Sequence, residues 1–219
     1  MEKRLIDYDD LTKSEKIDHI WEYYKFHIIV GICLVLFVFS LLNHYIFNPP
    51  PEVTLDISVF GEYGVPDVIE ELELTLQEMI IKDGENEEVL VDFFTIGEDQ
   101  SYDIQQAMVT KMIGKATIHE FDIMVFEGDF FMNYLEENAL LPLNDLVESG
   151  VIDVDLDQLK TASDFGLDDE KIYLIDISEH EGFKRMFLSD EPIYLAVFGL
   201  SEHTEHTSEA LDYIINQFK

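Results

Sequence analysis

The sequence predicts an α/β fold: a mainly parallel sheet with helices on both faces, preceded by one transmembrane helix. Two observations lead to this prediction. Residues 28–47 form an apolar run that lacks Asp, Glu, Lys and Arg. Between residues 53 and 147, three short segments rich in β-branched and aromatic residues then alternate with three segments of helical periodicity. Such a β-α-β-α-β-α order favours parallel strands joined by right-handed crossovers.

The apolar run from Ile28 to Phe47 has the length of a transmembrane helix. A helix of about 20 residues spans about 30 Å, the thickness of the hydrocarbon core of a bilayer. Aromatic residues flank it, as they do at membrane interfaces, with Trp21 and Tyr24 before it and Tyr45 near its end. The alternative is a cleaved signal peptide, but its charged segment would be too long and no A-x-A cleavage site follows. We expect a retained, single-pass anchor in the lipid bilayer.

Positive charge predicts the orientation of this anchor. The basic residues that precede it are Lys3, Arg4, Lys13, Lys16 and Lys25. The next basic residue is Lys82, so the positive-inside rule places the N-terminus in the cytoplasm and the C-terminal domain outside the cell. The predicted parts are a cytoplasmic juxtamembrane helix (1–27), the transmembrane helix (28–47), a proline spacer (48–52) and an extracytoplasmic α/β domain (53–219).

The composition excludes some functions. The chain has 13 basic and 47 acidic residues, a net charge of −34, which disfavours nucleic acid as a partner. Its acidity suits an exported surface, a salty or alkaline habitat, or a cation-binding surface, and the sequence does not separate these three. Cys33 is the only cysteine and lies in the apolar run, so the chain has no intramolecular disulfide and no CxxC motif.

The outer domain shows a regular order of elements up to about Gly150 and a weaker one after it. Polar residues that can cap helices are Asp67, Ser101 and Asp129, and Thr207 or Ser208 can cap the last helix. The expected strands are 53–60, 88–96, 121–126, 171–177 and 192–198. The expected helices are 68–82, 101–114, 129–138 and a last one up to 218, with a short helical turn at 144–147.

Two segments resemble a known family. FDIMVFEGDFFMNYLEENALLPLNDLV, from Phe121, and PIYLAVFGLSEHTEHTSEALDYII, from Pro192, are similar to parts of extracellular solute-binding proteins of the ABC-transporter sugar-binding type. The N-terminal IWEYYKFHIIVGI is similar to anchors of membrane proteins of Gram-positive bacteria. The resemblance covers roughly residues 53–147 and 192–218. Because such proteins have two lobes and about twice the length, it implies a single periplasmic-binding-protein-like lobe.

A binding site is expected where the strands end, because ligands of open parallel sheets sit outside the carboxyl ends of the strands. We expect Asp129 to cap the following helix and Glu127 to be left facing a ligand. Such an acidic rim suits a divalent cation or a cationic solute, and the alternative is a solvated edge on an acidic protein. The candidate rim residues are Glu62, Tyr63, Glu98, Glu127, Asp129 and Ser201, with His203 and His206 beside them.

Metal binding is a secondary prediction. His203 and His206 are candidate zinc ligands, although their segment precedes a helix rather than lying on one helical face. Residues 153–157 alternate Asp with apolar residues and resemble half of a calcium loop, without the glycine and the bidentate glutamate that the loop needs. We therefore expect no cofactor, with Ca²⁺ or Zn²⁺ as the alternative.

The sequence contains no catalytic motif of the GxSxG, HExxH, P-loop or GxGxxG type. The leading prediction is a non-catalytic, membrane-anchored, extracytoplasmic binding or interaction module whose partner is a small solute, a cation or a neighbouring membrane protein. The alternatives are a metal-dependent hydrolase at the cell surface and a structural subunit of a membrane complex.

Overall fold

The structure is a computed structural model that describes residues 12–81, 86–96, 101–117, 121–201 and 204–218. Contacts divide the chain into two units, Met1–Pro50 and Pro51–Lys219. Each unit is described by itself.

The first unit is a long helix. Helix α1 (Lys13–Leu42) continues into a π-helical turn, η2 (Asn43–Phe47), which the Asn48 amide closes by donating to the Asn43 carbonyl oxygen at 2.8 Å. The stretch Trp21–Phe47 is long and apolar enough to cross a membrane, and none of its residues is buried within its own unit. By length and composition it is compatible with a membrane anchor or a signal sequence.

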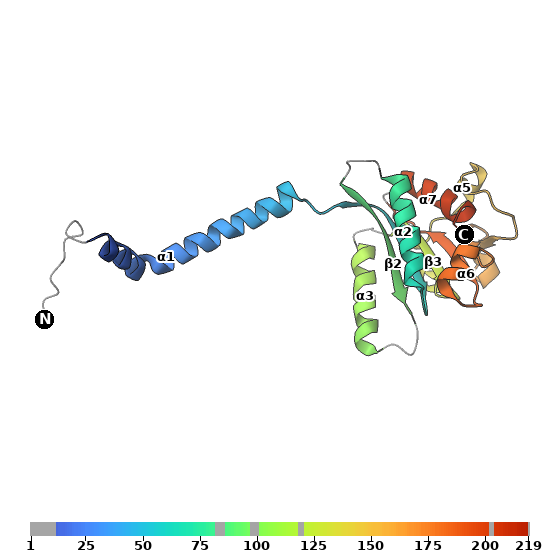
Figure 1. Cartoon of the computed structure of the whole chain (residues 1–219). Coiled ribbons are helices and arrows are strands. Elements are labelled where there is room, and N and C mark those ends of the chain that lie inside the picture. The colour runs from blue at the N-terminus through green and yellow to red at the C-terminus, as the bar shows by residue number, and fades with distance from the viewer. Residues whose placement is uncertain (1–11, 82–85, 97–100, 118–120, 202–203, 219) are drawn as a thin grey trace. The chain divides into compact units, whose positions relative to one another are not determined.

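The second unit is built on one six-stranded sheet with the order β2-β1-β3-β6-β5-β4 (Figure 1). The strands are β1 (Glu52–Gly61), β2 (Glu87–Thr95), β3 (Ile123–Glu127), β4 (Leu159–Thr161), β5 (Ile172–Asp176) and β6 (Ile193–Val197). The helices are α2 (Pro66–Ile80), α3 (Tyr102–Thr117), α4 (Met132–Glu136), α5 (Asn144–Glu148), α6 (Glu181–Phe187) and α7 (Thr204–Asn216), with a 3-10 turn, η3 (Ala162–Phe165).

The predicted α/β class and single sheet are confirmed, but the sheet is mixed. Strand β1 pairs in parallel with β2 and β3, whereas β6, β5 and β4 are added antiparallel. Parallel neighbours need a crossover of about a dozen residues or more, usually a helix. Residues 162–171, which join β4 to β5, are too short for that crossover, so these two strands pair antiparallel.

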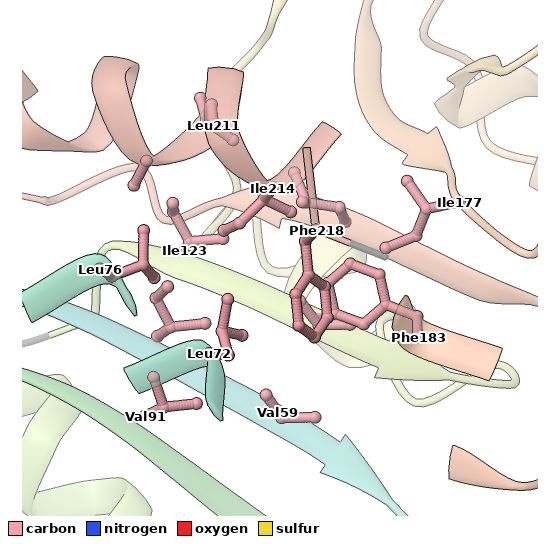
Figure 2. Packing of buried hydrophobic residues seen from close by; sticks show 14 of the residues in the cluster. Val59, Leu72, Leu76, Val91, Ile123, Ile177, Phe183, Leu211, Ile214 and Phe218 are labelled. Atoms are coloured by element: carbon pink, nitrogen blue, oxygen red, sulfur yellow. The ribbon is translucent and has the colours of Figure 1, made fainter. Parts of the chain in front are cut away.

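Helices cover both faces of the sheet, as predicted, and β1 is buried on both of its sides. Leu55, Ile57 and Val59 of β1 are fully buried on the face that α2, α6 and α7 cover. Figure 2 shows Leu72 and Leu76 of α2 and Ile214 of α7 converging on the same layer as Val59. Helix α2 buries a residue every fourth position along one stripe, namely Val68, Leu72, Leu76 and Ile80.

The opposite face carries an aromatic core, on the side where α3 lies in Figure 1. Phe60 of β1 stacks between Phe94 of β2 and Phe126 of β3, with ring centroids 5.0 Å apart in each pair. Phe131 and Tyr134 join this cluster from the α4 segment. These rings fix the α4 segment and the ends of β1 and β3 with respect to one another.

Candidate functional site

The carboxyl ends of β1, β2 and β3 lie at one edge of the sheet, and a hydrogen bond ties two of them together. The amide of Glu62, just after β1, donates to Oε2 of Glu127 at the end of β3, at 2.7 Å. Glu127 is only 3% exposed. Gly61 makes room for this carboxylate, because a Cβ at that position would lie 2.7 Å from both Glu127 Oε2 and a ring carbon of Phe187.

Asp129 does not have the role that the sequence suggested, and Glu127 is more buried than a free rim carboxylate would be. Glu127 is buried and engaged by a backbone amide, whereas Asp129 is exposed. Gly128 adopts a left-handed φ of +67°, so the chain turns before α4 begins. The N-cap of α4 is Phe131, with no side-chain cap, and the prediction that Asp129 caps this helix is wrong.

A cavity of about 680 Å³ opens beside this edge, between α3 and α4. Its lining is mostly apolar, and its polar groups are a carboxylate, two side-chain amides and two hydroxyls, which come from the end of β1, β2, α3 and α4. This is the composition that small-molecule sites have, namely an apolar lining with a few polar groups that orient the ligand. The lining residues are Glu62, Thr95, Ile96, Gln105, Met108, Val109, Met112, Phe130, Asn133 and Tyr134.

A second cavity of about 420 Å³ adjoins the first, because Glu62 and Phe130 line both. It is acidic, with carboxylates from the ends of β1 and β3 and from the segment before β6. Its lining residues are Glu62, Glu127, Gly128, Asp129, Phe130, Ser189 and Glu191. We call the two cavities together the carboxyl-edge groove, with an apolar half and an acidic half.

None of the described residues that line the acidic half is basic. The ion pairs found among the described residues lie elsewhere, for example between Arg185 and Glu71 and between Lys184 and Glu179. Within the described part of the chain, none of Glu62, Glu127, Asp129 and Glu191 pairs with a lysine or an arginine. The carboxylates of this half therefore repel one another without a counter-charge from any of the described residues.

A buried ionic cluster holds α3, the outer wall of the apolar half, onto the sheet. Lys115 of α3 is 6% exposed and pairs with Asp56 of β1, which is fully buried, and with Asp92 of β2 at 2.5 Å. Lys111, one helical turn earlier, also contacts Asp92 at 2.5 Å. Asp56 and the neighbouring Asp122 are linked through the Asp56 amide, which donates to Asp122 Oδ2 at 2.8 Å.

Burial and ion pairing act in opposite directions on the pKa values of this cluster. Burial raises the pKa of Asp56 to about 6, although Lys115 opposes the shift. Burial would lower the pKa of Lys115, but the charge and hydrogen bond of Asp56 outweigh it and raise that pKa. Burial would likewise raise the pKa of Asp92, but hydrogen bonds from Lys111 and Lys115 outweigh it and lower that pKa.

The structure does not bring all the predicted rim residues together. Glu62, Glu127 and Asp129 line the acidic half, and Tyr63 is exposed at the same edge without lining either cavity. Ser201 lies at the other edge, where its hydroxyl donates to Asp122 Oδ1 at 2.5 Å, just before β3 begins. The reason is that β6 runs antiparallel to β3, so the chain leaves β6 at the amino ends of the parallel strands.

Of the two predicted histidines, the structure describes His206, which lies at that other end. His206 is half-buried near the start of α7, which follows β6 and Ser201. His203 and Glu98 lie outside the described residues. Within the part of the chain that the structure describes, no three His, Cys, Asp or Glu side chains are grouped closely enough to hold a metal ion.

Sequence reasoning missed the apolar half of the groove. Met108 and Met112 lie one turn apart on α3, and Phe130 and Tyr134 lie at the same spacing around the start of α4. The signal was present, since these pairs have helical spacing, but such pairs also occur in ordinary cores. Glu191 was missed because it is brought to the groove by the turn before β6, which no sequence pattern predicts.

No protein-family model matches this chain, and no curated protein matches it. Among solved structures, an ABC substrate-binding protein from Listeria monocytogenes in complex with cycloalternan is 18% identical, with a TM-score of 0.33. The match covers 56% of this chain and 28% of that chain. The structure of CpMnBP1 with mannobiose bound is 15% identical, with a TM-score of 0.32, and the match covers 56% of this chain and 29% of that one. The chain therefore spans less than a third of either protein, and its fold class follows from the strand order described above.

Proposed function

We propose that this chain is a non-catalytic binding module that is anchored in the membrane and presents its α/β domain outside the cell. The observation that carries the proposal is the carboxyl-edge groove, in which an apolar cavity of about 680 Å³ adjoins an acidic one of about 420 Å³. Most drug-sized ligands occupy sites of about 300–1,000 Å³. The groove also lies at the carboxyl ends of β1, β2 and β3, where open α/β sheets bind ligands.

The chemistry of the groove favours binding over catalysis. Hydrolysis needs a nucleophile or an activated water with a base in hydrogen-bond reach. Among the described residues, those that line the groove include no histidine and no cysteine, and Glu127, its buried carboxylate, is engaged by a backbone amide. A metal-dependent hydrolase has no supporting observation among the described residues.

The anchor supports the proposed location. Ile28–Phe47 would cross the bilayer once, with the N-terminus in the cytoplasm and residues 53–219 outside. The apolar stretch Trp21–Phe47 is long enough for this, and the basic residues lie before it. A ligand would then be captured at the outer surface of the cell.

A membrane-protein partner is the second candidate, and α3 carries the observation that favours it. Val109 and Ile113, one helical turn apart on this helix, are 52% and 62% exposed. Val109 also lines the apolar half of the groove. Exposed apolar side chains grouped in this way are typical of a surface that another protein covers.

A ligand screen on the full chain in nanodiscs tests the proposed function. Small solutes that bind the groove are expected to raise the melting temperature of the domain, since a ligand stabilises the state that it binds. The variant Met112→Trp fills the apolar half and should abolish the shift. Leu74→Trp, on an exposed position of α2 away from the groove, is the matched control. A shift that persists in Met112→Trp, or no shift with any solute, would contradict the proposed function.

A further inference from the structure

The acidic half of the groove contains a buried carboxylate with an incomplete set of partners. Glu127 is 3% exposed and lines the 420 Å³ cavity. Its Oε2 accepts the Glu62 amide at 2.7 Å. Among the described residues, that amide is the only hydrogen-bond donor to this carboxylate, and no lysine or arginine pairs with it.

Burying such a carboxylate is costly unless hydrogen bonds or an opposite charge compensate it. The domain supplies a positive charge elsewhere, since Lys115 neutralises the equally buried Asp56. At Glu127 the neighbouring charges are instead Glu62, Asp129 and Glu191, all of the same sign. The cavity in front of Glu127 therefore has the electrostatic character of a cation site for which the described residues supply no cation.

The adjoining half restricts what kind of cation this is. Phe130 lines both cavities, and beyond it lie Met108, Met112 and Tyr134. An inorganic ion would use neither this apolar surface nor the face of an aromatic ring, and the described residues contain no group of three metal-ligating side chains. A neutral solute would fill the apolar half but leave Glu127 with the Glu62 amide as its one partner among the described residues.

We infer that the ligand of the carboxyl-edge groove is an organic cation with an apolar body, such as an alkyl- or arylalkyl-ammonium compound. Its ammonium group pairs with Glu127 and Glu62 in the acidic half, and its body lies over Phe130 against Met112 and Tyr134. Charge-assisted hydrogen bonds and a cation–π contact both favour this placement. This inference rests on the proposed binding function and adds the chemical class of the ligand.

The test compares two probes with the same body, 2-phenylethylammonium and 2-phenylethanol. Their binding to the full chain in nanodiscs of uncharged phosphatidylcholine is measured by ligand-observed NMR and by calorimetry. We expect the ammonium compound to bind about tenfold more tightly or better, which corresponds to about 1.4 kcal/mol or more. We expect Ca²⁺ not to compete at equal concentration.

Three variants distinguish pairing of the ammonium group with the groove carboxylates from a general attraction of cations to this acidic protein. Glu127→Gln keeps an acceptor for the Glu62 amide, and Glu191→Gln changes an exposed side chain, so both are expected to fold. Each variant should weaken binding of the ammonium compound by about tenfold without weakening binding of the alcohol. Glu209→Gln, an exposed position of α7, removes the same charge elsewhere and should leave binding unchanged.

The outcomes distinguish the ligand class from the binding function. If the alcohol binds as tightly as the ammonium compound and Met112→Trp blocks both, the groove binds ligands but the inferred class is wrong. If Glu209→Gln weakens binding of the ammonium compound as much as Glu127→Gln does, the preference for a cation comes from the net charge of the protein, and the inference is overturned. If neither probe binds, the inferred ligand class is wrong, and the solute screen of the proposed function decides whether the groove binds another ligand. If binding survives Met112→Trp, both the inference and the proposed function are contradicted.

Discussion

The ammonium group of Lys115 on α3 is paired with the carboxylate of Asp56 on β1, and both side chains are buried. This pair joins α3 to the central part of the sheet. The same helix lines the groove with Met108 and Met112, which precede Lys115 in the chain. The ion pair thus sets the position of the outer wall of the groove.

Replacing Lys115 by methionine tests how much this pair contributes. Lys115→Met keeps the apolar volume but leaves Asp56 buried without its counter-charge, which typically costs about 3–5 kcal/mol. We expect a loss of that size in the free energy of unfolding, measured by urea titration with far-UV circular dichroism in detergent. The double variant Lys115→Met with Asp56→Leu should recover most of the loss. A single variant as stable as the wild type would show that the pair does not hold α3.

The raised pKa of Asp56 predicts a pH dependence of stability. Because its folded-state pKa is about 6 against an ordinary 3.8, the folded state binds the proton more tightly than the unfolded state. Protonation of Asp56 therefore stabilises the folded state, and this contribution to the free energy of unfolding is at most about 3 kcal/mol. The contribution is fully present below pH 3.8 and is lost as the pH rises to about 6. The lowered pKa of Asp92 acts at lower pH and in the opposite direction.

The variant Asp56→Asn isolates this contribution. Lys115, Asp92 and the Asp122 carboxylate face the site and remain in the variant, as does Lys111 on Asp92. The difference in unfolding free energy between wild type and Asp56→Asn should therefore change between about pH 4 and pH 6 and be constant above that range. A difference that does not vary across this range would show that Asp56 titrates normally.

Two glycines with opposite surroundings provide a matched pair of substitutions. A Cβ on Gly61 would lie 2.7 Å from Glu127 Oε2 and from the Phe187 ring, whereas a Cβ on Gly114 of α3 meets nothing within 4 Å. We expect Gly61→Ala to destabilise the domain by about 1–3 kcal/mol through overpacking. Gly114→Ala should stabilise it by about 0.5–1 kcal/mol, as alanine does in helix interiors.

The two glycine variants should also differ in ligand binding, in addition to stability. Gly61→Ala displaces the Glu127 carboxylate and should weaken any ligand of the acidic half, measured by the same melting-temperature shift. Gly114→Ala changes no residue that lines the groove and should leave that shift intact. Equal behaviour of the two variants in both assays would contradict the close packing of Glu127 against Gly61.

Strong periodicity made the first half of the fold predictable. Helix α2 was expected at 68–82 and spans Pro66–Ile80, and β2 was expected at 88–96 and spans Glu87–Thr95. The short elements show too few repeats of hydrophobic periodicity to be predicted, since β4 has three residues and α6 has seven. In α6 the helical signal is further weakened by Gly182, which is required because a Cβ there would lie 2.5 Å from the Phe218 ring.

The direction of β6 explains why only part of the site was predicted. An apolar strand reads the same in either direction, so the sequence pattern does not show that β6 is antiparallel to β3. That direction separates Ser201 from Glu62 and Glu127, and it brings Glu191, before β6, to the groove. The failed prediction that Asp129 caps α4 has a similar cause. The chain makes a left-handed turn at Gly128, and α4 begins only at Met132.

The proposed topology is tested by labelling cysteines in intact cells that express the chain. In a Cys33→Ser background, a membrane-impermeant maleimide should label Glu209→Cys on the C-terminal domain. It should label Lys16→Cys, before the span, only after the membrane is permeabilised, because the positive-inside rule places this side in the cytoplasm. The chain should also keep its full mass and stay with the membrane fraction. Labelling of Lys16→Cys in intact cells would reverse the orientation, and release of a shortened chain would identify residues 28–47 as a cleaved signal sequence instead of an anchor.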